Sequence, residues 1–317
     1  MLSYIFVVVG FALMMGGADF FVRGAVRGAA ALKISSLIVG LTIVAWGTSL
    51  PELAVSIGAT GKDAAGIALG NVIGSNIANV LLIGGVAAMM LPLACPAGDL
   101  RRDAIFLAIA SVLATGLGAL GVLTVWMGLL LLGLLLLQTF TIYRAVHSGQ
   151  DVDVEMPDED DAQLALWKAG VFLLGGLVAV IAGSELLVRS AITVAGLWDV
   201  PDAIIGVTIV AIGTSLPELA TSLAAARQGE RDVIIGNIVG SNIANIVLVL
   251  GAVAVIAPGT IPAELLDGDG WVMIATSAVF VGLLMLGRTV GWLWGLAFLA
   301  AYAVYLGWQF QFFGLVG

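Results

Sequence analysis

Two glutamates, Glu52 and Glu218, occupy equivalent positions in a segment that the chain contains twice. Residues 40–56 (GLTIVAWGTSLPELAVS) and 206–222 (GVTIVAIGTSLPELATS) are identical at 14 of 17 positions. Each glutamate follows a proline in an apolar stretch, where an uncompensated charge is costly and usually functional. Neither has a basic residue within helical reach in the sequence. The pattern predicts a bound cation as counter-charge; the structural alternative is a pair of protonated glutamates hydrogen-bonded in a helical core.

Hydroxyl groups accompany both glutamates at helical spacing. Thr48 precedes Glu52 by four residues and Ser49 precedes it by three, so hydroxyls and carboxylate share one helix face. Thr214 and Ser215 stand in the same relation to the second glutamate. All of these groups offer oxygen, the ligand that hard cations prefer.

Pro51 and Pro217 are expected to interrupt the two helices. A proline cannot donate a hydrogen bond to the carbonyl four residues earlier, and its ring presses on that turn. The carbonyls concerned belong to Gly47 and Gly213. Free carbonyls at membrane depth are tolerated only where they are buried in protein or face a cavity, and there they can replace a cation's hydration shell.

A second repeated segment adds amides. Residues 70–79 (GNVIGSNIAN) and 236–245 (GNIVGSNIAN) are separated by the same offset of 166 residues. Each copy places a serine four residues before an asparagine: Ser75 and Asn79, then Ser241 and Asn245. The glycines spaced four apart also suit close helix packing, which is the alternative role of this segment. The other amides are expected to bond the interrupted backbone: Asn71, Asn76, Asn237 and Asn242.

The ligand types narrow the choice of cation. Two carboxylates with hydroxyl, amide and carbonyl oxygens suit Ca²⁺, which takes about six to eight oxygen ligands, better than Mg²⁺. The set contains no Cys or His, which disfavours softer transition metals. Na⁺ accepts similar oxygens, so the residues leave the counter-ion open. Competition of several Na⁺ with one Ca²⁺ for common oxygens would itself couple their movements.

The composition indicates a membrane protein. Of the 317 residues, 61% are apolar and only 10% are charged, and apolar runs of roughly 20 residues recur along the chain. The net charge of −9 says little about partners, because seven of the 21 acidic residues lie between Asp151 and Asp161. A single cysteine, Cys95, and a single histidine, His147, make neither an intrachain disulfide nor a zinc cluster. We therefore expect no enzyme, no cofactor and no nucleic-acid partner.

Ten apolar runs predict an all-α polytopic fold with ten transmembrane helices, five in each half. Their approximate ranges are 3–22, 34–58, 66–91, 104–121, 123–146, 166–188, 201–226, 232–257, 270–287 and 290–313. With the N-terminus outside, ten of the twelve Lys and Arg residues face the cytoplasm, as the positive-inside rule requires. The sequence thus predicts a multi-pass protein of the cytoplasmic (inner) membrane, a monomer with both termini outside, whose first run is a retained span.

An odd number of spans in each half means that the second half enters the membrane from the opposite side. Two inverted five-helix repeats are predicted, residues 1–146 and 166–317, joined by an acidic cytoplasmic connection at 147–165. Secondary transporters often have this plan, with the substrate site near the midplane where the repeats meet.

The first spans of the two halves also correspond. Asp19 aligns with Glu185, and Arg23 aligns with Arg189. The spacing of four residues near a span end predicts an interfacial ion pair within each helix, not a binding site.

At these motifs the chain resembles the cation/calcium antiporter superfamily, in particular its prokaryotic sodium/calcium exchanger branch. GTSLPE and the GSNI-type motif, each present twice, carry a resemblance that covers essentially the full length. It implies ion-binding side chains from both repeats: Thr48, Ser49, Glu52, Ser75 and Asn79 with Thr214, Ser215, Glu218, Ser241 and Asn245. It also implies that the carbonyls of Ala45 and Ala211 complete the sites, that spans 1 and 6 slide against the other eight, and that three Na⁺ exchange for one Ca²⁺.

One departure from the superfamily bears on the ions. Several members, including the potassium-dependent branch, have Asp where this chain has Asn245, so co-transport of K⁺ is disfavoured. The GNxxE-type repeats of the proton/calcium branch are absent from the sequence. The leading prediction is an electrogenic Na⁺/Ca²⁺ antiporter that works by alternating access. The alternatives are an antiporter that uses H⁺ or K⁺ or carries another divalent cation such as Mn²⁺, a cation channel, and an intramembrane enzyme.

Overall fold

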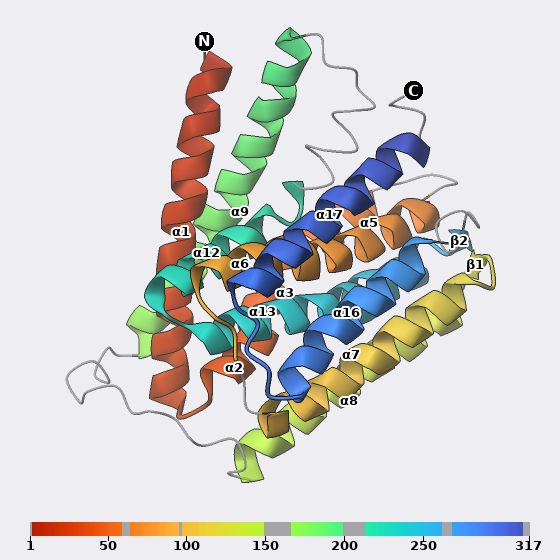
Figure 1. Ribbon diagram of the computed structural model, residues 1–317, viewed down its shortest axis with the longest axis horizontal. Helices are drawn as coiled ribbons and strands as arrows, with labels where there is room; N and C mark the ends of the chain where they lie inside the picture. The colour runs from red at the N-terminus through yellow and green to blue at the C-terminus, as the bar shows by residue number, and fades with distance from the viewer. Residues whose placement is uncertain are drawn as a thin grey trace.

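The chain folds into an all-helical bundle (Figure 1). The computed structural model describes residues 2–58, 64–94, 97–148, 166–198, 213–261 and 268–312. In chain order its elements are α1 (Leu2–Leu32), α2 (Ser36–Val39), the π-helix η1 (Gly40–Val44), α3 (Ala45–Thr48), α4 (Leu50–Gly58), α5 (Ala64–Ala78), the π-helix η2 (Asn79–Gly84), α6 (Gly85–Met90), α7 (Ala97–Gly118), β1 (Val122–Leu123), α8 (Val125–Ser148), α9 (Leu166–Leu197), α12 (Leu216–Gln228), α13 (Arg231–Ala244), the π-helix η4 (Asn245–Leu250), α14 (Gly251–Ile256), β2 (Gly259–Thr260), α16 (Asp269–Met285) and α17 (Trp292–Phe312). The two strands have two residues each and pair antiparallel, so the predicted all-α class is confirmed.

Helices occupy the described parts of the ten predicted spans. Within the described ranges, six helical stretches are long and apolar enough to cross a membrane: Leu2–Leu32, Ser36–Gly58, Ala65–Met90, Val125–Val146, Leu166–Leu197 and Arg231–Ile256. Asp269–Met285 is apolar and shorter. Of the seventh predicted span, the part from residue 213 onward is described. The sequence predictions on Cys95, Ala211 and the acidic segment 151–162 lie outside the described residues.

The ends of α1 and α9 were predicted wrongly. Hydropathy places them at residues 22 and 188, whereas the helices continue to Leu32 and Leu197. Their 31 and 32 residues measure about 47 Å at 1.5 Å per residue, which exceeds the roughly 30 Å thickness of a hydrocarbon core. Hydropathy reports where apolar side chains stop, while the helical backbone satisfies its own hydrogen bonds beyond that point.

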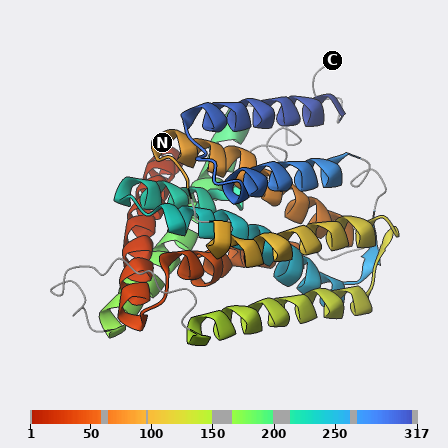
Figure 2. The same ribbon diagram turned by 60° about the horizontal axis from the view of Figure 1, so that its bottom comes forward.

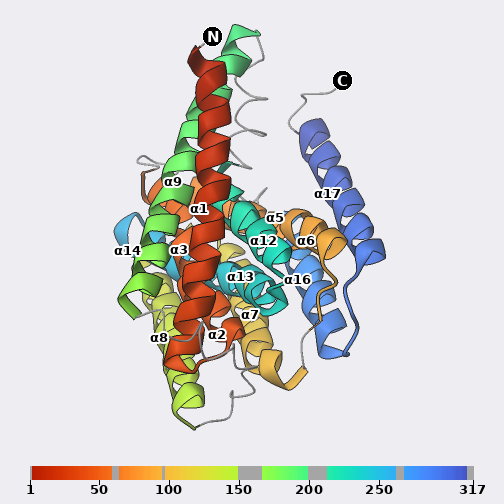
Figure 3. The same cartoon turned by 90° about the vertical axis from the view of Figure 1, so that its left-hand side faces the viewer.

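α1 and α9 are the first helices of the two copies, and they lie side by side in opposite directions (Figures 1 and 3). A Cβ added at Gly10 would lie 2.9 Å from the carbonyl oxygen of Gly183, and one added at Gly176 would lie 2.7 Å from that of Gly17. The offset of 166 residues relates Gly10 to Gly176 and Gly17 to Gly183, so each contact is the counterpart of the other. We call these four residues the glycine seam. Antiparallel packing of equivalent helices is the arrangement that inverted repeats predict.

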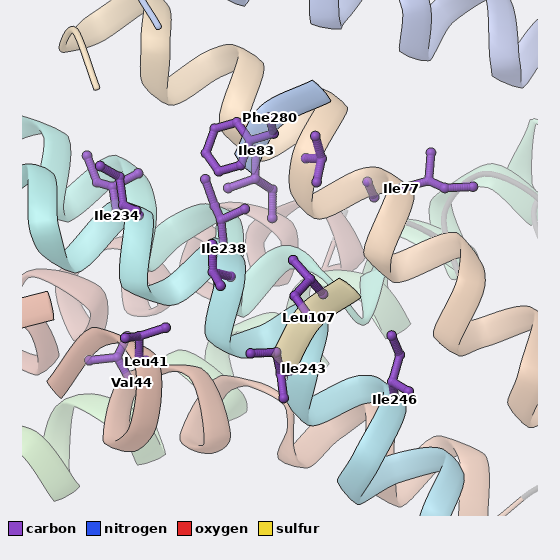
Figure 4. Packing of buried hydrophobic residues seen from close by; sticks show 14 of the residues in the cluster. Leu41, Val44, Ile77, Ile83, Leu107, Ile234, Ile238, Ile243, Ile246 and Phe280 are labelled. Atoms are coloured by element: carbon purple, nitrogen blue, oxygen red, sulfur yellow. The ribbon is translucent and has the colours of Figure 1, made fainter. Parts of the chain in front are cut away.

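The centre of the molecule is formed by α13 and η4. Every residue from Val233 to Val247 is buried. In Figure 4, Ile234 and Ile238 of α13 belong to one buried cluster with Leu41 and Phe280, which come from distant segments. The interrupted helices of both copies, through η1, α3 and α12, pack directly on this centre.

Four helices flank the centre: α7, α8, α16 and α17. They run roughly parallel to one another as the yellow, yellow-green and blue ribbons of Figure 2. Many of their outward side chains are apolar and exposed, such as Leu136 and Val304. Such a surface suits lipid.

Candidate ion-binding site

Both proline-containing helices are interrupted next to the candidate glutamates. α3 ends at Thr48 and α4 begins at Leu50, with Ser49 between them at φ −80° and ψ 2°. In the second copy Ser215 has φ −88° and ψ 3°, and α12 begins at the next residue with Pro217 in its first turn. The predicted interruptions are therefore confirmed, because a proline ring in the following turn excludes the regular hydrogen bond.

The carbonyls near the interruptions are already engaged. The carbonyl of Ala45 accepts hydrogen bonds from the Ser49 amide at 3.0 Å and from the Thr48 hydroxyl at 3.2 Å. The carbonyl of Gly213, which was predicted to be left free by Pro217, accepts from the Ser184 hydroxyl of α9 at 3.3 Å. A cation at the Ala45 oxygen would have to displace one of its two donors, whereas the Gly213 oxygen keeps a second lone pair. The unpaired buried oxygens of this region belong to side chains.

All ten candidate side chains are buried, and the two glutamates are only 1% exposed. No described residue donates a hydrogen bond to any of their four carboxylate oxygens. The same holds for further oxygens of the candidate set, namely those of Ser49, Ser75, Thr214 and Ser215 and the Oδ1 atoms of Asn79 and Asn245. Buried polar atoms are normally paired, and a buried charge without a partner is strongly unfavourable.

The two copies meet at these side chains. The Glu52 and Glu218 carboxylates are neighbours, so two negative charges there would repel each other. Thr48 and Ser49 of the first copy lie beside the Glu218 carboxylate of the second copy. The region therefore combines two acidic groups with neutral oxygens from both halves of the chain. A hard cation would relieve the repulsion and occupy the unpaired oxygens.

The asparagines that begin the second segment bind neighbouring helices of their own copy. Asn71 donates to the Ser56 hydroxyl at 3.0 Å, and its counterpart Asn237 donates to the Ser222 hydroxyl at 3.1 Å. Asn237 also donates to the backbone carbonyl of Glu218 at 3.3 Å, so the predicted backbone role is confirmed for this residue.

Asn237 also receives hydrogen bonds from two candidate ligands. Its Oδ1 lies 3.4 Å from the hydroxyl of Thr48, whose single proton is shared with the Ala45 carbonyl, and it accepts from the hydroxyl of Ser241 at 3.4 Å. The first of these contacts joins the two copies.

The later asparagines join the two copies. Asn76 and Asn242 bond each other's backbone carbonyls, and they accept from Asn245 and Asn79 respectively. Asn79 and Asn245 each begin a π-helical segment, η2 and η4, a local distortion that is frequent at functional sites. The candidate amides therefore lie at irregular points of two otherwise regular helices.

The glycines of this segment differ between the copies. A Cβ at Gly236 would lie 2.6 Å from the Leu37 carbonyl oxygen, and one at Gly240 would lie 2.7 Å from Ala45 Cβ. A Cβ at Gly74 would meet nothing within 4 Å. Packing thus explains glycines of the second copy, but it accounts for none of the amide contacts.

The sequence patterns did not identify Thr221 as a candidate ligand. This residue is fully buried on α12, three residues after Glu218, and its hydroxyl has no hydrogen-bond partner in the described part of the chain. Its counterpart in the first copy is Val55, which is exposed. Repetition was the signal that selected candidates, and it cannot find a residue that only one copy contains.

Only one of the two ion pairs predicted within helices is formed as predicted. Glu185 and Arg189 of α9 pair with each other. Asp19 of α1 pairs instead with Arg227 at the end of α12, at 3.0 Å. The prediction for Asp19 and Arg23 was therefore wrong, because Arg227 of α12 forms the ion pair with the Asp19 carboxylate.

Comparison with known proteins shows the family of this chain. The family model described as sodium/calcium exchanger protein matches residues 2–144 and 168–311. The chain is 32% identical to the sodium/calcium exchanger MaX1 of Methanosarcina acetivorans, covering 92% of each protein. It is 34% identical to the inner membrane protein YrbG of Escherichia coli, covering 92% of this chain and 96% of YrbG.

A solved structure shares the whole architecture. The sodium-calcium exchanger NCX_Mj, soaked with Na⁺ and Ca²⁺, superposes with a TM-score of 0.84 at 30% identity, covering 97% of this chain and 98% of that one. Two matched repeats and this likeness over nearly the full length exclude an enzyme and identify a transporter fold. The chain belongs to the sodium/calcium exchanger family.

Proposed function

We propose that this protein is a Na⁺/Ca²⁺ antiporter that works by alternating access. The observation that carries the proposal is the pair of buried carboxylates, Glu52 and Glu218, whose four oxygens receive no hydrogen bond from the described residues. Both copies also contribute hydroxyl and amide oxygens that have no hydrogen-bond partner among the described residues. Two negative charges balance one Ca²⁺, and the mixture of carboxylate, hydroxyl and amide oxygens suits its flexible coordination.

The proposed ligands are the side chains that both copies supply. They are Thr48, Ser49, Glu52, Ser75 and Asn79 with Thr214, Ser215, Glu218, Ser241 and Asn245. The backbone carbonyls of Ala45 and Ala211 would join them during transport, the former after release of the Thr48 hydroxyl. Na⁺ ions would use the same oxygens, so that Ca²⁺ and Na⁺ exclude each other.

The exchange is proposed to be electrogenic, with three Na⁺ for each Ca²⁺. Three sodium charges on two carboxylates leave one positive charge, whereas one Ca²⁺ leaves none. The ratio follows the family resemblance, and Asn79 and Asn245 keep the rest of the ligand set neutral.

The placement in the membrane follows from the distribution of basic residues. We propose the cytoplasmic membrane with both termini outside, a first repeat at residues 1–146, a cytoplasmic connection at 147–165 and a second repeat at 166–317. YrbG, a relative of similar length, is an inner membrane protein.

Ion flux into proteoliposomes tests the function. Purified protein is reconstituted with Na⁺ inside, and ⁴⁵Ca²⁺ uptake is measured after dilution into buffers that contain Na⁺, K⁺, choline or a pH gradient. Uptake should require an outward Na⁺ gradient and should be unchanged when K⁺ is replaced by choline. Uptake driven by a proton gradient alone, or an absolute need for K⁺, would replace this proposal with the corresponding antiporter. Uptake that follows the Ca²⁺ gradient without any counter-ion would indicate a channel.

A further inference from the structure

Asn76 and Asn242 hold each other's backbone across the boundary between the two copies. Asn76 Nδ2 donates to the carbonyl oxygen of Asn242 at 3.2 Å, and Asn242 Nδ2 donates to that of Asn76 at 3.4 Å. Both residues are completely buried. They are counterparts at the offset of 166 residues, so the contact is reciprocal.

Each of these side chains also accepts a hydrogen bond from a proposed ligand. Asn245 Nδ2 donates to Asn76 Oδ1 at 3.2 Å, and Asn79 Nδ2 donates to Asn242 Oδ1 at 3.0 Å. Asn76 therefore bridges a carbonyl and an amide that lie three residues apart on the partner helix. Asn242 makes the same bridge on the helix of the first copy.

The direction of every amide in this network is determined by the backbone. A carbonyl oxygen can only accept, so Asn76 must turn its NH₂ group toward the carbonyl of Asn242. Its own Oδ1 then remains for Asn245, which must offer its NH₂ group. The Oδ1 of Asn245 is left facing away from this contact, and no described residue donates to it. The same sequence of constraints leaves the Oδ1 of Asn79 unpaired.

We infer that Asn76 and Asn242 are positioning residues that orient the amides of Asn245 and Asn79 with oxygen toward the transported ion. This inference rests on the proposed function, because it assigns the unpaired Oδ1 atoms to a cation. It also requires a hydrogen-bond donor at positions 79 and 245. An ionised aspartate there would set a negative oxygen against the Oδ1 of its positioning residue, so the network selects a neutral ligand.

Asn71 provides a matched control. It is an asparagine of the same motif, and its amide donates to Ser56, which is not a proposed ligand. Loss of its side chain should affect folding to a similar or lesser degree without disturbing the orientation of Asn79 or Asn245.

A double-mutant cycle tests the inference. Asn76→Ala is measured in the wild-type background, in an Asn245→Ala background and in an Asn79→Ala background. The readouts are the half-saturating Ca²⁺ concentration and maximal rate of Na⁺-driven uptake, together with the Ca²⁺-dependent rise in melting temperature. If Asn76→Ala does not fold, Asn76→Ser replaces it, because a hydroxyl can bond the Asn242 carbonyl yet cannot also reach Asn245.

Asn76→Ala should raise the half-saturating Ca²⁺ concentration about ten-fold, the effect of losing one well-oriented ligand. It should have little further effect when Asn245 is already Ala, and its full effect when Asn79 is Ala. Asn71→Ala should leave the Ca²⁺ concentration dependence unchanged. Equal effects of Asn76→Ala in all three backgrounds, or an unchanged half-saturating concentration, would show that Asn76 orients no ligand. A wild-type protein that neither binds nor transports Ca²⁺ would instead overturn the proposed function, so the two failures are distinguishable.

Discussion

Arg227 Nη2 lies 3.0 Å from Asp19 Oδ1 and thereby joins the end of α12 to the middle of α1. Gln228 adds a hydrogen bond from its side-chain amide to the Asp19 backbone carbonyl at 3.3 Å. In the other copy, Glu185 pairs with Arg189 of its own helix. The two copies therefore use equivalent acidic positions differently, and only the first copy uses its acid to connect separate helices.

Arg227→Gln should reduce stability by at most about 1 kcal/mol, because both partners are partly exposed and such pairs contribute little. The loss should shrink at high salt, where exposed charges are screened. Thermal unfolding in detergent at two ionic strengths measures it. Glu185→Gln is the control: it breaks a pair within one helix and should change the melting temperature less. A larger loss that is insensitive to salt would mean that Arg227 acts through packing.

Glu52→Gln and Glu218→Gln should each abolish Ca²⁺ uptake while folded protein accumulates normally. Removing one charge from a buried divalent site should cost about 3 kcal/mol or more, which weakens binding by over 100-fold. The measurement is Na⁺-driven ⁴⁵Ca²⁺ uptake by equal amounts of reconstituted protein. Glu185→Gln, which changes an exposed acid of the same type, should transport like the wild type. Uptake at the wild-type rate in either central variant would refute the site.

Membrane voltage should drive the exchange if three Na⁺ are exchanged for one Ca²⁺. A potential of about 100 mV acts on one elementary charge with about 2.3 kcal/mol, which shifts the equilibrium Ca²⁺ ratio roughly fifty-fold. Diffusion potentials of both signs are imposed on proteoliposomes at a fixed Na⁺ gradient. Negative potential inside should favour Na⁺ entry with Ca²⁺ exit, and positive potential should favour Ca²⁺ entry. Sodium-dependent flux that ignores voltage would indicate electroneutral exchange of two Na⁺ for one Ca²⁺.

Gly17→Ala should destabilise the protein, whereas Gly16→Ala should not. A Cβ at Gly17 would lie 2.7 Å from Ala179 Cβ and 2.8 Å from the Val180 nitrogen, so α1 and α9 would have to separate. We expect a loss of about 1–3 kcal/mol, the usual effect of overpacking. A Cβ at Gly16 would meet nothing within 4 Å, and alanine favours a helix by about 1 kcal/mol over glycine. Melting temperatures of the two variants provide the comparison, and equal values would contradict close packing at Gly17.

The sequence was most informative where the two copies agree. Duplication identified the interrupted helices around Ser49 and Ser215, because proline chemistry acts locally and occurs in both segments. It also predicted the inverted arrangement, since an odd number of spans per half reverses the second copy. Neither prediction depends on contacts between distant residues.

Contacts between the two copies could not be predicted from residue spacing within one segment. Asp19 and Arg227 are 208 residues apart, and the spacing within one helix favoured Arg23 instead. The bond from Thr48 to Asn237 and the exchange between Asn76 and Asn242 likewise need the packed structure. The π-helical segments at Asn79 and Asn245 also leave no sequence signal, because they are a shift of backbone hydrogen bonding within an otherwise helical run.

The reciprocal contact between Asn76 and Asn242 has the form of an isologous interface, in which the same patch of two subunits meets itself. The boundary between the two halves is therefore that of a symmetric homodimer contained in one polypeptide. In a true homodimer any substitution changes both sides of the interface together. Fusion into one chain removes this constraint, so equivalent positions can differ. The counterpart of Thr221 in the other copy is Val55, and the counterpart of Ser184, which donates to the Gly213 carbonyl, is Ala18.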